Sequence, residues 1–186
     1  MGEHELIHLA KELLELMDKT ADKSLPKEIA DTVKLHSKLA VGSAWIPVPG
    51  ADVAAGAANI WTMYGRINGK IGISLKENVI KSIAAGVATN LTSYVALSGV
   101  ASTLKFIPGI GTIGGALIMS SSLYAVTLVS GWVYLKALSI MARRKSTSIT
   151  SADFKAAIDE VLANKDVIKN FLNQQRQIIR LMLNIL

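Results

Sequence analysis

The sequence contains no cysteine, few aromatic residues and little charge. The absence of cysteine excludes disulfides and thiolate zinc sites, and it fits a reducing cytoplasm. Charged residues make up 18% of the chain, whereas an average soluble domain has about 25%. Aromatic residues make up only 5%, so the 51% of hydrophobic residues are mostly alanine, isoleucine, leucine and valine. Such a composition favours closely packed helices, in a bundle or in a membrane.

Signals for export are also lacking. Residues 1–5 are acidic, and no apolar h-region of a cleavable signal peptide follows them. We therefore expect the protein in the cytoplasm or at the cytoplasmic face of the inner membrane. The net charge of +6 is concentrated late in the chain, where residues 143–186 hold eight basic and four acidic residues. A basic tail with few aromatic residues favours an anionic membrane surface over nucleic acid as the partner.

Two long uncharged stretches dominate the centre of the chain. No charged residue lies in 82–104 or in 106–135, and only Lys105 separates the two stretches. They meet at Phe106-Ile107-Pro108-Gly109-Ile110-Gly111, where proline and glycine interrupt helical structure. No segment of useful length alternates polar and apolar residues, so we predict no sheet. The expected fold is an all-α helical bundle around a central apolar hairpin, about 75–104 and 112–142.

Amphipathic helices are expected on both sides of this hairpin, within one domain that spans residues 1–186. Residues 1–44 form the N-terminal helices, 45–142 the apolar core region and 143–186 the basic C-terminal helices. The helices are predicted at 3–19, 25–44, 51–68, 151–163 and 167–185, the second of them capped by Ser24 with Pro26 in its first turn. Ser74-Leu75-Lys76-Glu77 and Thr150-Ser151-Ala152-Asp153 match the capping box, in which a hydroxyl and a carboxylate each bind a free backbone N–H at a helix start.

Two loops and the basic tail are the candidate contact sites. Trp45-Ile46-Pro47-Val48-Pro49-Gly50 echoes the turn at 106–111, because each has an aromatic residue, isoleucine and proline before glycine. The basic stripe of the last helix fits an interfacial helix on anionic lipid or an outer helix with a solvated face. The candidate residues for membrane or partner contact are Trp45, Pro47, Pro49, Phe106, Ile107, Pro108, Arg143, Arg144, Lys145, Lys169, Arg176 and Arg180.

Three short motifs resemble those of a YcjF-like bacterial family of helical domains, over about residues 40–142. They are Pro47-Val48-Pro49-Gly50-Ala51-Asp52-Val53-Ala54-Ala55, then Gly72-Ile73-Ser74-Leu75, then the turn at 106–111. The resemblance implies an all-helical domain of unknown function, often membrane-associated and often beside or fused to GTPase domains. It brings no catalytic residues to carry over. The chain has no Gly-x-x-x-x-Gly-Lys-Ser/Thr loop, so any nucleotide hydrolysis would belong to a partner.

Three polar features have both a functional and a structural interpretation. His4-Glu5-Leu6-Ile7-His8 matches the H-E-x-x-H motif of zinc peptidases, but no sheet is expected to form a substrate cleft, so we prefer a solvated helix surface. Asp52 is interpreted as a favourable charge at a helix start rather than an intramembrane carboxylate. Asn90 is interpreted as a core hydrogen-bonding residue rather than a bridge between helices. We expect no metal, no cofactor and no enzymatic activity.

The patterns together favour a non-enzymatic, membrane-associated helical domain that anchors or regulates a partner protein. The resemblance makes a GTPase the expected partner, and homo-oligomerisation is open. The two uncharged stretches are long enough to span a bilayer, which takes about 20 apolar residues. The first stretch is diluted by serine, threonine and asparagine, so the second is the stronger candidate for a membrane span. Both are also compatible with burial in a soluble bundle, so a soluble interaction module and a pore-forming helical protein remain as alternatives.

Overall fold

The computed structural model describes residues 15, 19, 22–23, 25–43, 51–97, 112–144, 150–166 and 168. This part of the chain contains five helices and no strand. The helices are α2 (Lys27–Ser43), α3 (Ala51–Ile71), α4 (Glu77–Leu97), α6 (Thr112–Arg143) and α7 (Ser151–Ala163). The all-α helical bundle expected from the sequence is therefore confirmed. The predicted helices at 3–19 and 167–185 lie almost wholly outside the described residues.

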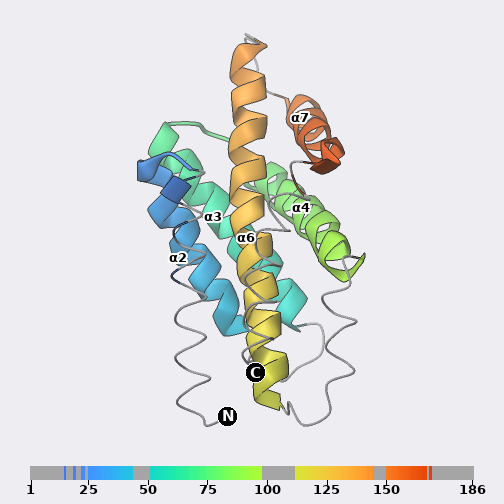
Figure 1. Ribbon diagram of the computed structural model, residues 1–186. Coiled ribbons are helices and arrows are strands. Elements are labelled where there is room, and N and C mark those ends of the chain that lie inside the picture. Colours follow the sequence, from blue (N-terminus) through green and yellow to red (C-terminus); the bar gives the residue numbers. More distant parts are fainter. Residues whose placement is uncertain are drawn as a thin grey trace.

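Helix α6 is the centre of the bundle, and α2, α3, α4 and α7 all pack against it (Figure 1). Its residues 124–131 are buried without interruption, because neighbours cover every side of the helix at this level. A helix that is covered on all sides needs apolar or small residues all round, and this explains why α6 has no polar face. The second arm of the predicted hairpin is thus the core helix of the fold.

Helix α4, the first arm of the predicted hairpin, is covered on one side only. It packs on α3 and α6 through a buried face that includes Ile83, Val87 and Leu91. The opposite face is exposed to solvent and consists of small or uncharged polar side chains: Ser82, Ala85, Gly86, Thr89 and Asn90. The stretch 82–104 is therefore uncharged but not wholly apolar, because its part of α4 has a polar exposed face. The turn that would join the two arms, residues 98–111, lies outside the described residues.

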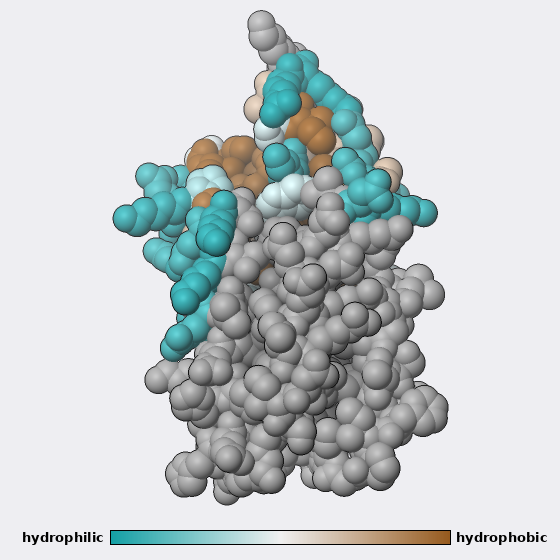
Figure 2. Space-filling model, viewed as in Figure 1, coloured by the Kyte–Doolittle hydropathy of each residue, from teal (hydrophilic) through white to brown (hydrophobic). Residues whose placement is uncertain are grey.

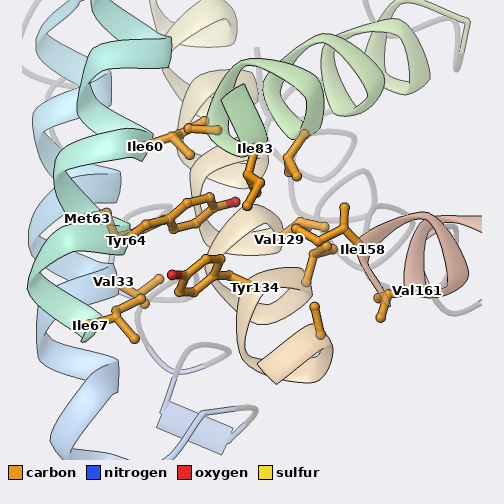
Figure 3. Packing of buried hydrophobic residues seen from close by; sticks show 14 of the residues in the cluster. Val33, Ile60, Met63, Tyr64, Ile67, Ile83, Val129, Tyr134, Ile158 and Val161 are labelled. Atoms are coloured by element: carbon orange, nitrogen blue, oxygen red, sulfur yellow. The ribbon is translucent and has the colours of Figure 1, made fainter. Parts of the chain in front are cut away.

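Three aromatic side chains connect α3 and α7 to α6, and Figure 3 shows two of them, Tyr64 and Tyr134. Tyr64 of α3 stacks on Tyr134 of α6, with ring centroids 3.9 Å apart and an interplanar angle of 11°. Phe154 of α7 meets Tyr134 edge-on at 5.3 Å. The hydroxyl of Tyr64 donates to the carbonyl of Ser130 at 3.1 Å, and that of Tyr134 donates to Oδ1 of Asn68 at 2.7 Å. Burial raises the pKa of both phenols far above the ordinary value.

Helices α3 and α4 have other boundaries than the sequence predicted. Helix α3 ends at Ile71 rather than Asn68, where Gly72 with φ +70° and the bond from Ile73 N–H to the Asn68 carbonyl form a Schellman-type end. Helix α4 begins at Glu77 rather than at Leu75, since the Lys76 carbonyl accepts its first hydrogen bonds. The capping box predicted at Ser74 was therefore misplaced.

The capping box of α7 is confirmed. The side chain of Thr150 accepts a hydrogen bond from the backbone N–H of Asp153 at 3.2 Å, and the carboxylate of Asp153 accepts one from the backbone N–H of Thr150 at 3.3 Å. The Thr150 hydroxyl also donates to the Asp153 carboxylate at 2.5 Å, and this bond, together with the one from the Thr150 backbone N–H, lowers the pKa of Asp153. The helix runs over Ser151–Ala163, as the sequence predicted.

We expect Thr150→Ala to lower the free energy of unfolding by about 1 kcal/mol, because one backbone donor at the start of α7 loses its acceptor. The measurement is urea unfolding followed by circular dichroism. Thr150→Ser keeps the hydroxyl and is the matched control, with an expected stability close to that of the unaltered protein. Equal losses in both variants would show that the cap contributes nothing.

Candidate functional site

The uncharged parts of four helices lie toward one end of the bundle. Helix α2 ends, α3 begins, α4 ends and α6 begins toward this end, the lower one in Figure 1. Ser120 Oγ of α6 donates to the Val41 carbonyl of α2 at 3.5 Å. The first half of α6 therefore lies beside the last turn of α2. We call residues 39–43, 53–65, 82–97 and 112–135 the uncharged region, because none of them is charged.

Two proline-containing segments adjoin this region in the sequence. Residues 44–50 connect the end of α2 to the start of α3, and residues 98–111 connect the end of α4 to the start of α6, but both segments lie outside the described residues. Among the neighbouring described residues, only Asp52 in the first turn of α3 is charged, and its backbone position agrees with the favourable helix-start charge expected. The side chain of Asp52 lies outside the described part, as does Lys105.

Polar side chains of the uncharged region hydrogen-bond to their own helices. Asn90 Nδ2 donates to the Gly86 carbonyl at 3.0 Å, and Thr89 Oγ1 donates to the Ala85 carbonyl at 2.9 Å. Thr62 makes the same kind of bond to the Ala58 carbonyl at 2.8 Å. The interpretation of Asn90 as a core residue was wrong, because its side chain is exposed on α4. Such internally satisfied groups cost less in an apolar environment than free ones.

One segment in the described part of the chain, Leu123–Arg143 within α6, is long and apolar enough to cross a membrane. Most of this segment is buried inside the bundle. The core helix of a water-soluble bundle has the same length and composition, so this segment alone does not distinguish a membrane protein from a soluble one.

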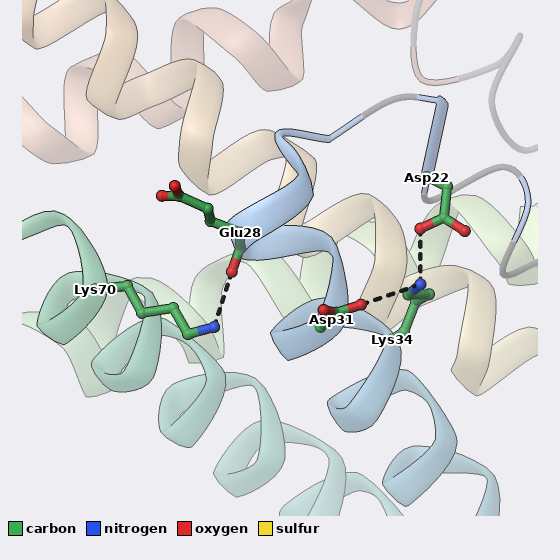
Figure 4. Close-up of polar contacts among 5 residues, drawn as sticks. All are labelled: Asp22, Glu28, Asp31, Lys34 and Lys70. Atoms are coloured by element: carbon green, nitrogen blue, oxygen red, sulfur yellow. Dashed lines mark hydrogen bonds and ion pairs between the residues drawn. The ribbon is translucent and has the colours of Figure 1, made fainter.

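The opposite end of the bundle is charged. Lys34 of α2 donates to Asp22 at 2.7 Å and lies 3.2 Å from Asp31, and Lys70 of α3 donates to the carbonyl of Glu28 at 2.8 Å (Figure 4). The hydrogen bond with Asp22 raises the pKa of Lys34. Figure 2 shows hydrophilic side chains around patches of apolar surface at this end. The described bundle is therefore polarised along its length.

Of the twelve residues predicted to contact a membrane or partner, the structure describes two, Arg143 and Arg144. Both are exposed at the charged end, where α6 finishes. Arg144 pairs with Glu160 of α7 at 2.5 Å and so links the ends of these helices. The other ten residues lie outside the described part: Trp45, Pro47, Pro49, Phe106, Ile107, Pro108, Lys145, Lys169, Arg176 and Arg180.

A groove of about 610 Å³ lies between α4 and α7. Ile83 and Ile158 form a buried apolar floor, and Ser82, Lys155 and Asp159 are among the exposed polar residues along it. Its volume falls in the range of about 300–1,000 Å³ that small-ligand sites occupy. Sequence reasoning missed this groove, since it depends on where α7 packs after the linker that follows α6.

A buried histidine joins α2 to α3. His36 is 1% exposed, and its Nδ1 lies 2.8 Å from Oδ1 of Asn59 on α3, whose Nδ2 donates to the His36 carbonyl at 2.7 Å. Because Asn59 Oδ1 can only accept, Nδ1 carries the proton and Nε2 does not. Within the described part of the chain, neither Nε2 nor the adjacent Ser37 hydroxyl, both buried, has a hydrogen-bond partner. No pattern in the sequence predicts the contact between His36 and Asn59.

Among the described residues, no group of three or more histidine, aspartate or glutamate side chains could hold a metal ion. The His4-to-His8 motif lies outside that part of the chain. Comparisons of the chain with protein-family models, with curated proteins and with solved structures found no match.

Proposed function

We propose that this protein is a non-enzymatic, membrane-associated helical domain that anchors or regulates a partner protein. The observation that supports the proposal is the polarised bundle, in which the uncharged parts of α2, α3, α4 and α6 lie toward one end. A charged side chain at the centre of a bilayer costs about 2.5–3.5 kcal/mol or more, so a surface that meets lipid must avoid charge. The uncharged region has no charged residue over parts of four helices, although residues 124–131 of it are buried inside the bundle.

The proposed orientation places the two proline-containing segments, 44–50 and 98–111, in the lipid interface and the charged end in water. Trp45 and Phe106 each begin one loop motif, and tryptophan is enriched at membrane interfaces. Arg143 and Arg144 lie at the other end of α6, where they remain in the aqueous phase. This arrangement leaves the charged end free for a partner. The expectation that the partner is a GTPase rests on the resemblance alone.

Vesicle flotation tests the proposal. We expect the protein to float with vesicles of phosphatidylcholine and phosphatidylserine, and the double substitution Trp45→Glu with Phe106→Glu to reduce the bound fraction more than about tenfold, because two carboxylates must then be desolvated. Ile71→Glu is the matched control, since it adds the same charge at an exposed position, 38% accessible, near the charged end. A protein that never floats, or a control that loses binding equally, contradicts the proposal.

A soluble interaction module is the second candidate, and the groove between α4 and α7 favours it. In that case the protein stays in the dense fraction of the flotation gradient. The groove would then be the surface to alter, and Gly86→Trp fills it, since nothing lies within 4 Å of the position of an added Cβ. Release of a trapped dye from the vesicles would instead identify pore formation.

A further inference from the structure

The contact between His36 and Asn59 joins two helices through a titratable group in the interior. Asn59 holds His36 twice, at the imidazole and at the backbone carbonyl. The neutral imidazole uses Nδ1–H in this contact, and Nε2 faces the interior with no described partner. A proton added at Nε2 therefore creates both a charge and an unpaired donor in a buried position.

We propose that the His36–Asn59 contact is an acid-sensitive latch, which holds α2 on α3 and α6 at neutral pH and releases α2 when Nε2 is protonated. The proposal concerns a conformational change of α2 and does not require a membrane. Its consequence for lipid binding rests on the proposed function, because release of α2 would uncover the central helix α6.

Among the described residues, none that packs around His36 offers an acid to compensate a positive charge on it. On α3, the cation Arg66 acts unfavourably on the imidazolium. Asp52 is the acid that precedes Asn59 by two helical turns on α3, which places it about 10 Å further along the helix. On α6, the titratable residues of 112–135 are the phenols of Tyr124 and Tyr134, both buried. On α2 itself, Asp31 is bound to Lys34, and Lys38 is a further exposed cation.

The direction of the pH effect follows from these contacts. Burial lowers the pKa of His36 below its ordinary value of 6.5, the hydrogen bond with Asn59 opposes this, and Arg66 lowers the pKa further. A released His36 regains the ordinary value and binds a proton more readily than the buried one. The closed state is thus favoured fully above about pH 6.5, and its advantage is lost as the pH falls toward the pKa of the buried imidazole.

Release of α2 would expose a tight helix–helix contact. Val33 of α2 lies against Gly131 of α6, where an added Cβ would be only 2.9 Å from a methyl group of Val33. The Ser120 hydroxyl reaches the Val41 carbonyl near the other end of α2. Both contacts lie on the face of α6 that α2 covers, so the whole of this face becomes accessible when α2 leaves.

Hydrogen exchange of the full chain tests the latch. The measured quantity is the fraction of time in which the amides of α2 are open to exchange, obtained by correcting the exchange rates for their intrinsic pH dependence. We expect this fraction to rise by up to about tenfold per pH unit below about pH 6.5. The amides of α7, which packs on α6 and α4, should change less. Asn59→Asp places a carboxylate on Nδ1 that stabilises the imidazolium, so the rise should disappear or reverse. His36→Gln removes the titrating group and should make α2 independent of pH in this range.

The chain provides its own control, because its other two histidines are His4 and His8. The double substitution His4→Gln with His8→Gln should leave the pH response of α2 unchanged. The latch is wrong if this variant abolishes the response, if α2 and α7 respond alike, or if Asn59→Asp responds as the unaltered protein does. Should His36→Gln not fold, Asn59→Asp still decides the matter through the sign of the effect.

Flotation at both ends of this pH range separates the latch from the proposed function. If both are right, binding to phosphatidylserine-containing vesicles increases as the pH falls, and Asn59→Asp removes the increase. If α2 responds to pH but the protein never floats, the latch stands and the membrane proposal fails. If the protein floats at every pH while α2 does not respond, the latch fails and the membrane proposal stands.

Discussion

Substitution of Gly131 by alanine is expected to lower the free energy of unfolding by about 1–3 kcal/mol, as overpacking of a tight core does. The added Cβ would lie 2.9 and 3.0 Å from the two methyl carbons of Val33 and 3.6 Å from Cε of Met63. Val33 is fully buried and β-branched, so it has little freedom to turn aside. The same substitution improves helix propensity, which alone would raise the free energy of unfolding. A measured decrease therefore reports the overpacking.

Gly86→Ala is the matched control for this experiment. Gly86 also lies inside a helix, but nothing is within 4 Å of an added Cβ, and we expect a gain of about 0.5–1 kcal/mol. Combining Gly131→Ala with Val33→Ala should cost less than the sum of the two single changes, since the smaller residue relieves the overlap. Additive costs, measured by urea unfolding, would show that α2 and α6 do not meet in this way.

Substitution of Tyr134 should have the largest effect on stability. Tyr134→Ala removes the ring that lies between Tyr64 and Phe154, and we expect a loss of about 3–5 kcal/mol. Tyr134→Phe keeps the ring but leaves Oδ1 of Asn68 without its donor. The Nδ2 of Asn68 is already buried without a hydrogen-bond partner among the described residues, so the expected loss is about 1–3 kcal/mol.

The contribution of the Tyr134 hydroxyl to the free energy of unfolding is compared with that of a hydroxyl outside the core. Thr62→Ala removes an exposed hydroxyl that bonds only within its own helix, and it should change stability by less than about 0.5 kcal/mol. Urea unfolding of the three variants compares them directly. If Tyr134→Phe is as stable as Thr62→Ala, the bond to Asn68 contributes nothing and the account of this core is incorrect.

Local signals in the sequence predicted much of the helical fold. The hydroxyl and carboxylate of Thr150 and Asp153 stand at the spacing that the helix start requires, so the start of α7 could be read directly. The same pattern at Ser74 was misleading, because the next two residues remain outside the helix and Lys76 supplies the first carbonyl. A local sequence pattern indicates roughly where a helix begins. The packing around the segment determines which of the neighbouring residues is the first of the helix.

Features that depend on packing between distant segments could not be predicted. His36 and Asn59 are 23 residues apart, and neither carries a motif. The single hint is that His36 stands at the core spacing of α2, between Val33 and Ala40. Asn90 was misjudged for a related reason, since the orientation of α4 is set by its contacts with α3 and α6 and turns this amide outward.

Quenching of Trp45 by lipids brominated on their acyl chains tests most directly whether the uncharged end meets the bilayer. Trp61→Phe with Trp132→Phe leaves Trp45 as the single tryptophan, because the chain contains three. We predict that vesicles with brominated chains quench the Trp45 emission strongly, and that a single tryptophan placed instead at Ile71, near the charged end, is not quenched. Equal quenching at the two positions, or none at Trp45 with the protein mixed with excess vesicles, would contradict the account.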